Sequence, residues 1–258
     1  MKENRNFLLK AFQEYTSVFD TTDEKISLKI DHTYNVAANS DYIARKLELC
    51  ESDIETAWSI GMLHDIGRFE QVARTHSFID SAKSDHADEG VEYLFSKGEI
   101  RRFIPDIEKY PEDMKCIRLA IANHNRHVLP DNLTEREKLH CTIIRDADKL
   151  DIFRICTVNS FESVHEYPKE EVASSTISQA VVDSIMRHET VNYAERETPA
   201  DIFVGHIAMA FGLEFPFSRK LALEQRYLQK MADFIFYDEK VQSLYEKLCT
   251  ETFDFLNA

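Results

Sequence analysis

The sequence predicts an all-α fold, a helical bundle extended by additional helices toward the C-terminus. Apolar residues recur every three or four positions along most of the 258 residues, which is the spacing of one helix face. Glycine and proline number only six each, so the many tight turns of an all-β sandwich are disfavoured. Apolar residues make up 43% of the chain, which is enough for a sizeable core.

Capping residues place the helices of the first half. After Asp31-His32, apolar residues return at helical spacing. Ser52 is expected to be the N-cap of the next helix, with Glu55 at the capping-box position. Another helix is expected to open at Ser84, and a further one covers the segment MKCIRLAIANH, which follows a proline.

A long helix is predicted over the segment TEREKLHCTIIRDADKLDIFRIC, with Thr134 as its N-cap and Glu137 at the capping-box position. After it we expect a helix over 174–189, one opened by Thr198-Pro199, and a long C-terminal helix from about Phe217 onward.

The charge of the chain limits its partners. Lysine and arginine total 31 against 46 aspartates and glutamates, which gives a formal net charge of −15. A surface this acidic repels phosphate backbones, so we do not expect a long nucleic acid as partner. A small anionic substrate remains compatible, because a bound divalent metal can reverse the local field inside a cleft.

The cysteines and the apolar runs indicate a cytoplasmic protein that does not enter a membrane. The five cysteines are scattered and include no CxxC pair, which is typical of reduced core thiols. The first twenty residues form an amphipathic stretch without the apolar segment of a signal sequence. The longest apolar run, around 207–213, is far too short to span a bilayer.

An ordered series of histidines and aspartates stands on or at the ends of predicted helices, as in bundle folds that assemble metal sites from facing helices. An ionised carboxylate on an inward helix face is costly unless a cation compensates it. Imidazole and carboxylate donors together suit iron(II), manganese(II) or zinc better than calcium. The candidate ligands are His32, His64, Asp65, His86, His124 and Asp148.

The pattern H…HD…D formed by His32, His64-Asp65 within MLHDIGRF and Asp148 within RDADKLD resembles the HD-domain superfamily of metal-dependent phosphohydrolases. The resemblance runs over 28–155, and it implies an all-helical fold in which these four residues bind a divalent metal. We expect a single domain over 1–258, in which this motif-bearing core is followed by a C-terminal helical extension over 156–258.

The segment HADEGVEYL resembles the HxxxGxxxL stretch of the HD-GYP and other two-metal branches of the superfamily. This resemblance implies that His86 and His124 hold a second metal ion, so that Asp65 bridges the two. HD-GYP proteins, however, have paired histidines and a GYP loop, whereas this chain reads Asn-His-Asn and has no such loop. One ion and two ions therefore both remain open, and cyclic-di-GMP hydrolysis is disfavoured.

Two other branches fit less well. Hydrolases of guanosine tetraphosphate resemble one another in the acidic residues just after HD, where this chain reads IGRF. The dNTP triphosphohydrolases carry a further histidine there. The expected activity is hydrolysis of a nucleotide or other small phosphorylated compound by metal-activated water. Asp65 would orient that water or accept its proton, and Arg68 and Lys149 would contact the substrate phosphate.

Two alternatives stay open. The Asn-His-Asn departure favours a non-catalytic module that keeps its metal to bind or sense a nucleotide. A minority of HD-domain proteins carry out oxygenase chemistry at a di-iron centre, which would need both metal sites filled with iron. The other histidines are expected on surfaces or in local hydrogen bonds; they are His76, His127, His140, His165, His188 and His206.

Overall fold

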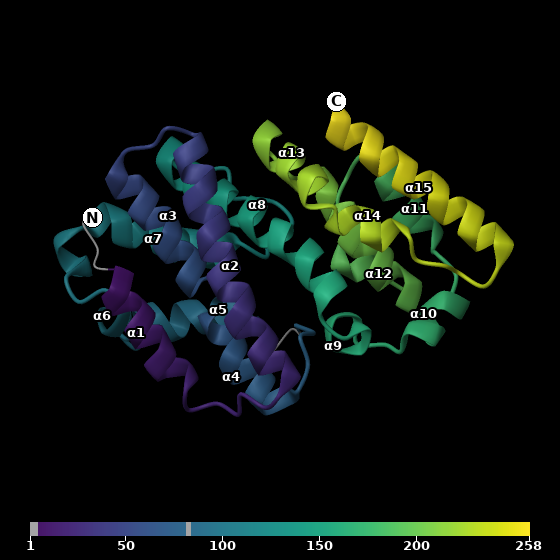
Figure 1. Cartoon of the computed structure of the whole chain (residues 1–258). Coiled ribbons are helices and arrows are strands. Elements are labelled where there is room, and N and C mark those ends of the chain that lie inside the picture. Colours follow the sequence, from purple (N-terminus) through teal and green to yellow (C-terminus); the bar gives the residue numbers. More distant parts are fainter. Residues whose placement is uncertain (1–4, 81–83) are drawn as a thin grey trace. The chain divides into compact units, whose positions relative to one another are not determined.

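The computed structural model describes residues 5–80 and 84–258 (Figure 1). Helices make up the regular secondary structure of these residues, and no β-strand occurs among them. The all-α prediction is therefore confirmed. Within the described residues, no helix combines the length and the apolar character that a membrane span requires.

The chain divides into two compact units, Met1–Asp148 and Lys149–Ala258, with the boundary inside helix α8. The single domain expected from the sequence stays a prediction. The helices of the first unit are α1 (Arg5–Thr16), α2 (Glu24–Lys46), α3 (Glu51–Leu63), α4 (Ile66–Thr75), α5 (His86–Val91), the π-helix η1 (Glu92–Ser96), α6 (Ile100–Phe103), the 3-10 helix η2 (Ile107–Lys109), α7 (Pro111–Asn123) and α8 (Glu135–Val158).

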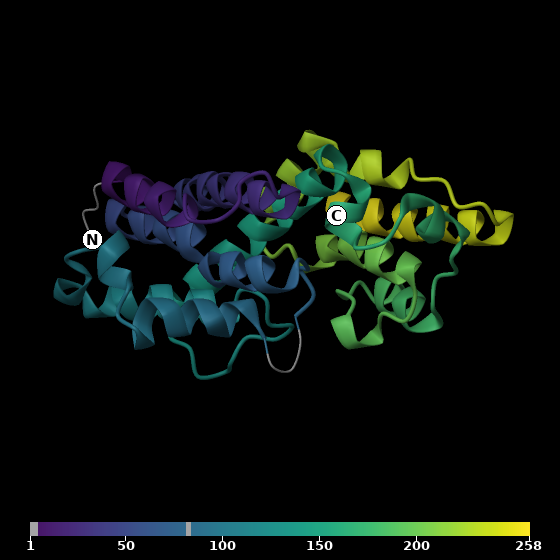
Figure 2. The ribbon, with the colours of Figure 1, turned by 90° about the horizontal axis from the view of Figure 1, so that it is seen from below.

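An aromatic part of the core of the first unit lies where α1 meets α4 and α6. Figure 2 shows α1 and α2, in purple, in a layer that faces the blue-green helices. Phe12 and Tyr15 of α1 contact the ring of Phe69, and Tyr15 also contacts Phe103. All four side chains are at most 4% exposed. Burial of aromatic side chains of this size is a main source of stability in a small domain.

Two glycines allow helices to approach closely on either side of the His64-Asp65 pair. A Cβ atom on Gly61 would lie 2.5 Å from the Cα atom of Ala37, so α3 packs directly against α2. A Cβ atom on Gly67 would lie 2.3 Å from the carbonyl oxygen of His86. Only glycine permits approaches of this kind between backbones. The two contacts fix the His64-Asp65 pair relative to α2 and α5.

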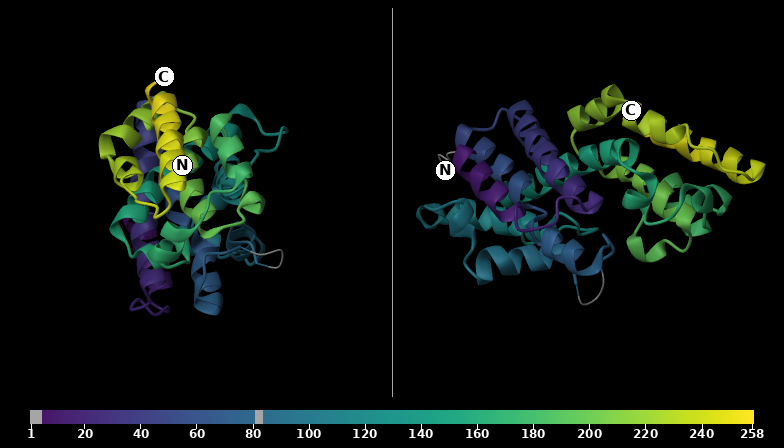
Figure 3. Two further views of the ribbon diagram at one scale, coloured as in Figure 1. Left: turned by 90° about the vertical axis from the view of Figure 1, so that its right-hand side faces the viewer. Right: turned by 60° about the horizontal axis from the view of Figure 1, so that its bottom comes forward.

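The second unit continues α8 with shorter helices and ends on α15, the long yellow helix in Figure 3. Its rings Phe203, Phe234, Phe236 and Tyr245 pack against one another in the core. Its elements are α9 (Phe161–His165), α10 (Lys169–Ser174), α11 (Gln179–Met186), η3 (Tyr193–Glu195), α12 (Pro199–Ala208), η4 (Met209–Gly212), α13 (Pro216–Gln225), α14 (Tyr227–Ala232) and α15 (Glu239–Asn257).

Two expected helix starts are confirmed: the capping box between Thr134 and Glu137, and the helix opened by Thr198. The Glu137 backbone nitrogen donates to Thr134 Oγ1 at 3.3 Å, and the Thr134 nitrogen donates to a Glu137 carboxylate oxygen at 2.8 Å. Thr198 forms a capping box with Asp201. The N-cap expected at Ser52 is wrong. The N-cap of α3 is Cys50, two residues earlier, and the helix begins at Glu51.

The long C-terminal helix expected from Phe217 onward is also wrong. Arg226 adopts a left-handed conformation, with φ of 60°, and ends α13. Residues 233–238 contain no helix. Asp238 then starts α15 by accepting hydrogen bonds from the backbone nitrogens of Lys240 and Val241, which is the usual action of an aspartate N-cap.

Candidate metal centre

All six ligand candidates meet in the first unit. His32 lies within α2 and Asp148 within α8, whereas the others stand at helix ends. His64 follows α3, Asp65 precedes α4, His124 follows α7 and His86 begins α5. The N-cap of α5 is Asp85 and not the expected Ser84. Helix ends bring these side chains inward from segments far apart in the sequence.

Three of these side chains form a first group that could hold a metal ion: His32, His64 and Asp148. The Nε2 atom of His32 lies 3.0 Å from Asp148 Oδ1, and that of His64 lies 3.8 Å from the same oxygen. Both histidines are fully buried. A second group consists of His64, Asp65 and His124, and His86 Nε2 lies 2.9 Å from His124 Nε2.

Asp65 lies between two pairs of histidines, and it presents a different carboxylate oxygen to each pair. Its Oδ2 atom lies 3.7 Å from His32 Nε2 and 3.5 Å from His64 Nε2. Its Oδ1 atom lies 3.3 Å from His86 Nε2 and 3.6 Å from His124 Nε2. This is the arrangement of a carboxylate that can bridge two ions, each with imidazole ligands of its own.

Hydrogen bonds to the backbone set the ring orientation of two histidines. Nδ1 of His64 lies 2.8 Å from the carbonyl oxygen of Gly61, and Nδ1 of His124 lies 2.8 Å from that of Ile121. Donation from Nδ1 leaves the lone pair on Nε2, the form in which imidazole binds a metal. The His64 Nε2 atom is buried and has no hydrogen-bond partner among the described residues. The donor set therefore fits a bound cation.

Asp80 and Arg68 hold His86 from the other side. Nδ1 of His86 lies 2.8 Å from an Asp80 carboxylate oxygen, and a guanidinium nitrogen of Arg68 lies 2.5 Å from the same ring atom. Arg68 also donates to Asp80 at 3.1 Å. With Nδ1 held between Asp80 and Arg68, the other nitrogen of His86 points toward Asp65 and His124, as in other carboxylate-supported metal ligands.

The environment keeps Asp65 ionised and keeps His64 and His86 neutral. Burial alone would raise the pKa of Asp65, but the nearby Lys29 ammonium and the imidazoles hold that pKa well below its ordinary value. Burial lowers the pKa of His64 to about 3, although Asp65 and Asp148 oppose this. Burial together with Arg68 lowers the pKa of His86 to about 4. Near neutral pH these are the protonation states that metal ligation requires.

Residues 30–152 match the family model of the HD domain, and this segment contains all six ligand candidates. These residues form an HD domain. No curated protein and no solved structure matches the chain. HD domains bind divalent metal ions, and the histidine and aspartate groups of this one are donors that could hold them.

Sequence reasoning missed Lys29, whose ammonium nitrogen lies 2.7 Å from Asp65 Oδ2. Its side chain is only 12% exposed. Lys29 stands three residues before His32 in α2, so the helical period places both side chains on one face. That spacing is the available signal in the sequence. Lysine is not a usual metal ligand, so the spacing alone does not connect Lys29 to a metal site.

The structure places Arg68 beside the centre, and it places the stem of Lys149 against Gly212. Arg68 is buried, and it contacts the side chain of Gln71 and the carbonyl oxygen of Phe78 in addition to Asp80 and His86. The alkyl stem of Lys149 lies against Gly212, within the second unit. The expected contact of Arg68 and Lys149 with a substrate phosphate stays a prediction for both.

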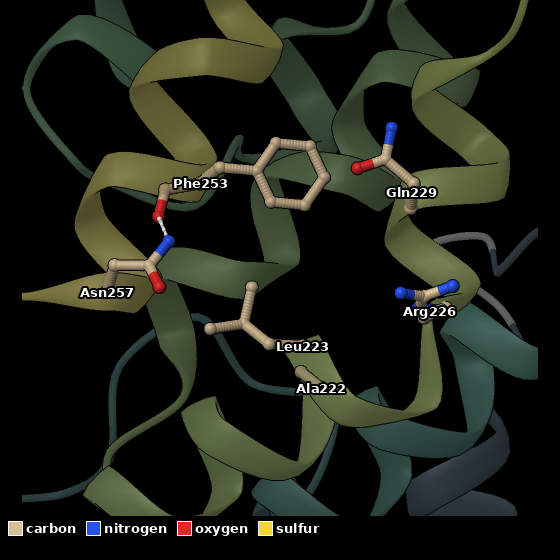
Figure 4. Close-up of a pocket in the computed structure, with 6 residues that line it drawn as sticks. All are labelled: Ala222, Leu223, Arg226, Gln229, Phe253 and Asn257. Carbon is tan, nitrogen blue, oxygen red and sulfur yellow. Dashed lines mark hydrogen bonds between the residues drawn. The ribbon is translucent and has the colours of Figure 1, made fainter.

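The second unit contains a pocket of about 650 Å³ between α13, α14 and α15 (Figure 4). Figure 4 shows Phe253 and Leu223 on its apolar side and Gln229 and Arg226 across from them. None of the ligand candidates lines it; the lining residues are Ala222, Leu223, Arg226, Gln229, Phe253 and Asn257.

Proposed function

We propose that this protein is a metal-dependent phosphohydrolase that cleaves a phosphoester or phosphoanhydride bond of a nucleotide or another small phosphorylated compound. The observation that carries the proposal is the position of Asp65, which directs one carboxylate oxygen toward His64 and the other toward His86. Divalent ions held in this way lower the pKa of bound water and polarise a phosphoryl oxygen.

We assign His32, His64, Asp65 and Asp148 to a first ion, and Asp65, His86 and His124 to a second. Histidine with carboxylate is a donor set for iron, manganese or zinc. The low pKa of Asp65 keeps this carboxylate an acceptor, so it orients the attacking water by hydrogen bonding. Lys29 balances the charge of Asp65. Arg68 holds His86 in place, and its guanidinium is a cation close to the reacting phosphate.

The same chemistry sets our expectations for substrate and compartment. The net charge of −15 disfavours a long nucleic acid and favours a small substrate that reaches the centre on its own. All five cysteines are free thiols, which supports a cytoplasmic location.

The test is turnover of a phosphoester and phosphoanhydride panel in the presence of manganese or iron(II), together with metal content per chain. Asp65→Ala should abolish turnover and lower the metal content, while the helical circular dichroism stays unchanged. Asp31→Ala is the matched control, because Asp31 is an exposed carboxylate next to His32 on the same helix. Full turnover in Asp65→Ala would refute the proposal.

Two other results would replace the proposal by one of its alternatives. Nucleotide binding without hydrolysis across the whole panel would indicate a regulatory module. Oxygen consumption that depends on two bound irons would indicate an oxygenase.

A further inference from the structure

A second group of metal-binding side chains lies wholly within the unit formed by residues 149–258. Cys156 on α8, His165 at the end of α9 and His206 on α12 each place one donor atom within 4.8 Å of the other two. Helices α9 and α12 are also neighbours in the fold. Three different helices therefore converge on this cluster, which has no residue in common with the HD-domain centre.

The two imidazoles face each other at the separation that a shared ion requires. The Nδ1 atoms of His165 and His206 are 3.1 Å apart. Zn–N bonds of about 2.0–2.1 Å at tetrahedral angles would place two ligand nitrogens roughly 3.3 Å apart. Only a small adjustment of the two rings would bring both nitrogens to one ion.

His165 is poorly explained as a packing residue. Its side chain is fully buried, and its Nε2 atom has no hydrogen-bond partner among the described residues. A buried polar atom left without a partner costs about 1–3 kcal/mol, which a phenylalanine at this position would avoid. A histidine at this position is therefore explained by its other ring nitrogen, Nδ1, which faces His206.

The donors differ from those of the HD-domain centre because a thiol replaces the carboxylates. One thiolate with two imidazoles suits a borderline-soft ion such as Zn²⁺ better than a hard ion such as Mg²⁺. The rings of Phe161 and Phe203 lie 4.3 Å and 5.2 Å from the His165 ring, centroid to centroid. These two rings cover His165, whereas Cys156 and His206 are half-buried.

Charge near the cluster is balanced. The guanidinium of Arg196 lies against Gly205, next to His206, and on its own it would oppose a cation. Buried Asp201 interacts with Arg196 and offsets this charge. On binding, the Cys156 thiol releases its proton to solvent, and the resulting thiolate neutralises one of the two charges of the ion.

We propose that Cys156, His165 and His206 form a second metal site that binds Zn²⁺ and joins α8, α9 and α12. A water molecule or another small ligand would complete the tetrahedron. The site is structural, and it is independent of the phosphohydrolase activity proposed above.

Cobalt(II) is the probe that distinguishes this site from the HD-domain centre. A thiolate ligand gives Co²⁺ a charge-transfer absorption in the near ultraviolet, whereas nitrogen and oxygen ligands do not. The full chain with Co²⁺ should show this absorption, and Asp65→Ala should retain it. Cys156→Ser should lose it and bind the ion at least tenfold more weakly. Cys249→Ser is the control and should retain it, since Cys249 is a buried thiol of the same unit outside the cluster.

Thermal unfolding supplies the second measurement. Excess Zn²⁺ should raise the Tm of the Asp65→Ala chain, and adding Cys156→Ser should remove most of that rise. If Cys156→Ser does not fold, His206→Ala should lose the high-affinity Co²⁺ binding and most of the absorption in its place. The proposal is overturned if the full chain shows no thiolate absorption, or if that absorption survives both substitutions.

Discussion

Each of the two units holds a pair of imidazoles in contact, but the side chains around the pairs differ. In the first unit, His86 and His124 are joined at 2.9 Å and are surrounded by aspartates and their cationic partners. In the second unit, the pair formed by His165 and His206, at 3.1 Å, is surrounded by a thiol and aromatic rings. The difference lies in what accompanies the histidines.

Carboxylates and thiols suit opposite uses of a bound ion. Carboxylates provide hard oxygen donors, and the partly exposed Asp148 leaves its centre open to exchange with solvent. A thiolate with two imidazoles holds a borderline-soft ion such as Zn²⁺ tightly. On the two proposals above, the first centre carries out the chemistry and the second stabilises the fold, and the following variants test that division.

The largest effect is expected for His64→Ala. His64 belongs to both candidate groups of the first centre, so its loss should lower kcat by about 10³-fold, which corresponds to about 4 kcal/mol of transition-state stabilisation. The Co²⁺–thiolate absorption of the second cluster should remain. Steady-state kinetics and absorption spectra measure the two effects on one preparation. If both are lost together, the two clusters are not independent.

A smaller effect is expected for Lys29→Met. Removing the ammonium that lies 2.7 Å from Asp65 leaves a buried carboxylate without its compensating charge. The free energy of unfolding should fall by about 3 kcal/mol in the presence of a chelator. Manganese should restore most of it, because the ion then balances Asp65. Urea denaturation with and without metal measures this, and Lys25→Met is the control on the same helix. An equal loss in both conditions would contradict the expectation.

Gly67→Ala tests whether backbone contact positions the first centre. The new Cβ atom would overlap the carbonyl oxygen of His86, at 2.3 Å, and the backbone nitrogen of Gly90, at 2.4 Å. Overpacking of this kind costs about 1–3 kcal/mol, and here it would also separate Asp65 from His86. The Tm and the metal content should both fall. Gly90→Ala is the control, since its nearest new contact is at 3.4 Å. Comparable losses in the two variants would exclude this explanation.

The smallest effect concerns a charged network of the first unit that needs no metal. Asp53 accepts hydrogen bonds from His140 Nε2 at 3.1 Å and Arg136 Nε at 2.8 Å. The bond from His140, with the contribution of Arg136, lowers the pKa of Asp53 despite partial burial. Because the pKa is lower in the folded state, the stabilisation is present above the ordinary aspartate pKa and is lost as the pH falls toward the folded-state value.

Asp53→Asn should therefore reduce the free energy of unfolding by about 1 kcal/mol near neutral pH, the usual contribution of a partly exposed ion pair. The difference from the unmodified chain should shrink in acid. Denaturation curves over a pH series measure it with chelator present. A difference that grows as the pH falls would show that the sign is wrong.

The all-α fold and the six ligand candidates that meet in the first unit could be predicted from the sequence, because both depend on local patterns. Helical periodicity and capping boxes are local signals, and His64-Asp65 with Asp148 stand in recognisable segments. Lys29 and Asp80 were missed because a partner of a ligand follows no motif of its own; only the folded chain brings Asp80 to His86.

Two features could not be predicted from the sequence, for different reasons: the break in the C-terminal helix, and the cluster formed by Cys156, His165 and His206. Arg226 ends α13 in a left-handed conformation. Glycine is the usual residue at such a helix end, so an arginine there gives no signal in the sequence. The donors Cys156, His165 and His206 are separated by intervals that match no metal-binding spacing. Tertiary packing alone brings them together.

The close approaches at Gly61 and Gly67 have a consequence for the entropy of metal binding. They fix the His64-Asp65 pair through contacts between backbones, in which no ligand atom takes part. The conformational entropy of arranging these two ligands is therefore lost during folding and not during binding. An ion that binds here would meet two ligands already in place, so more of the energy of each metal–ligand bond would appear as affinity.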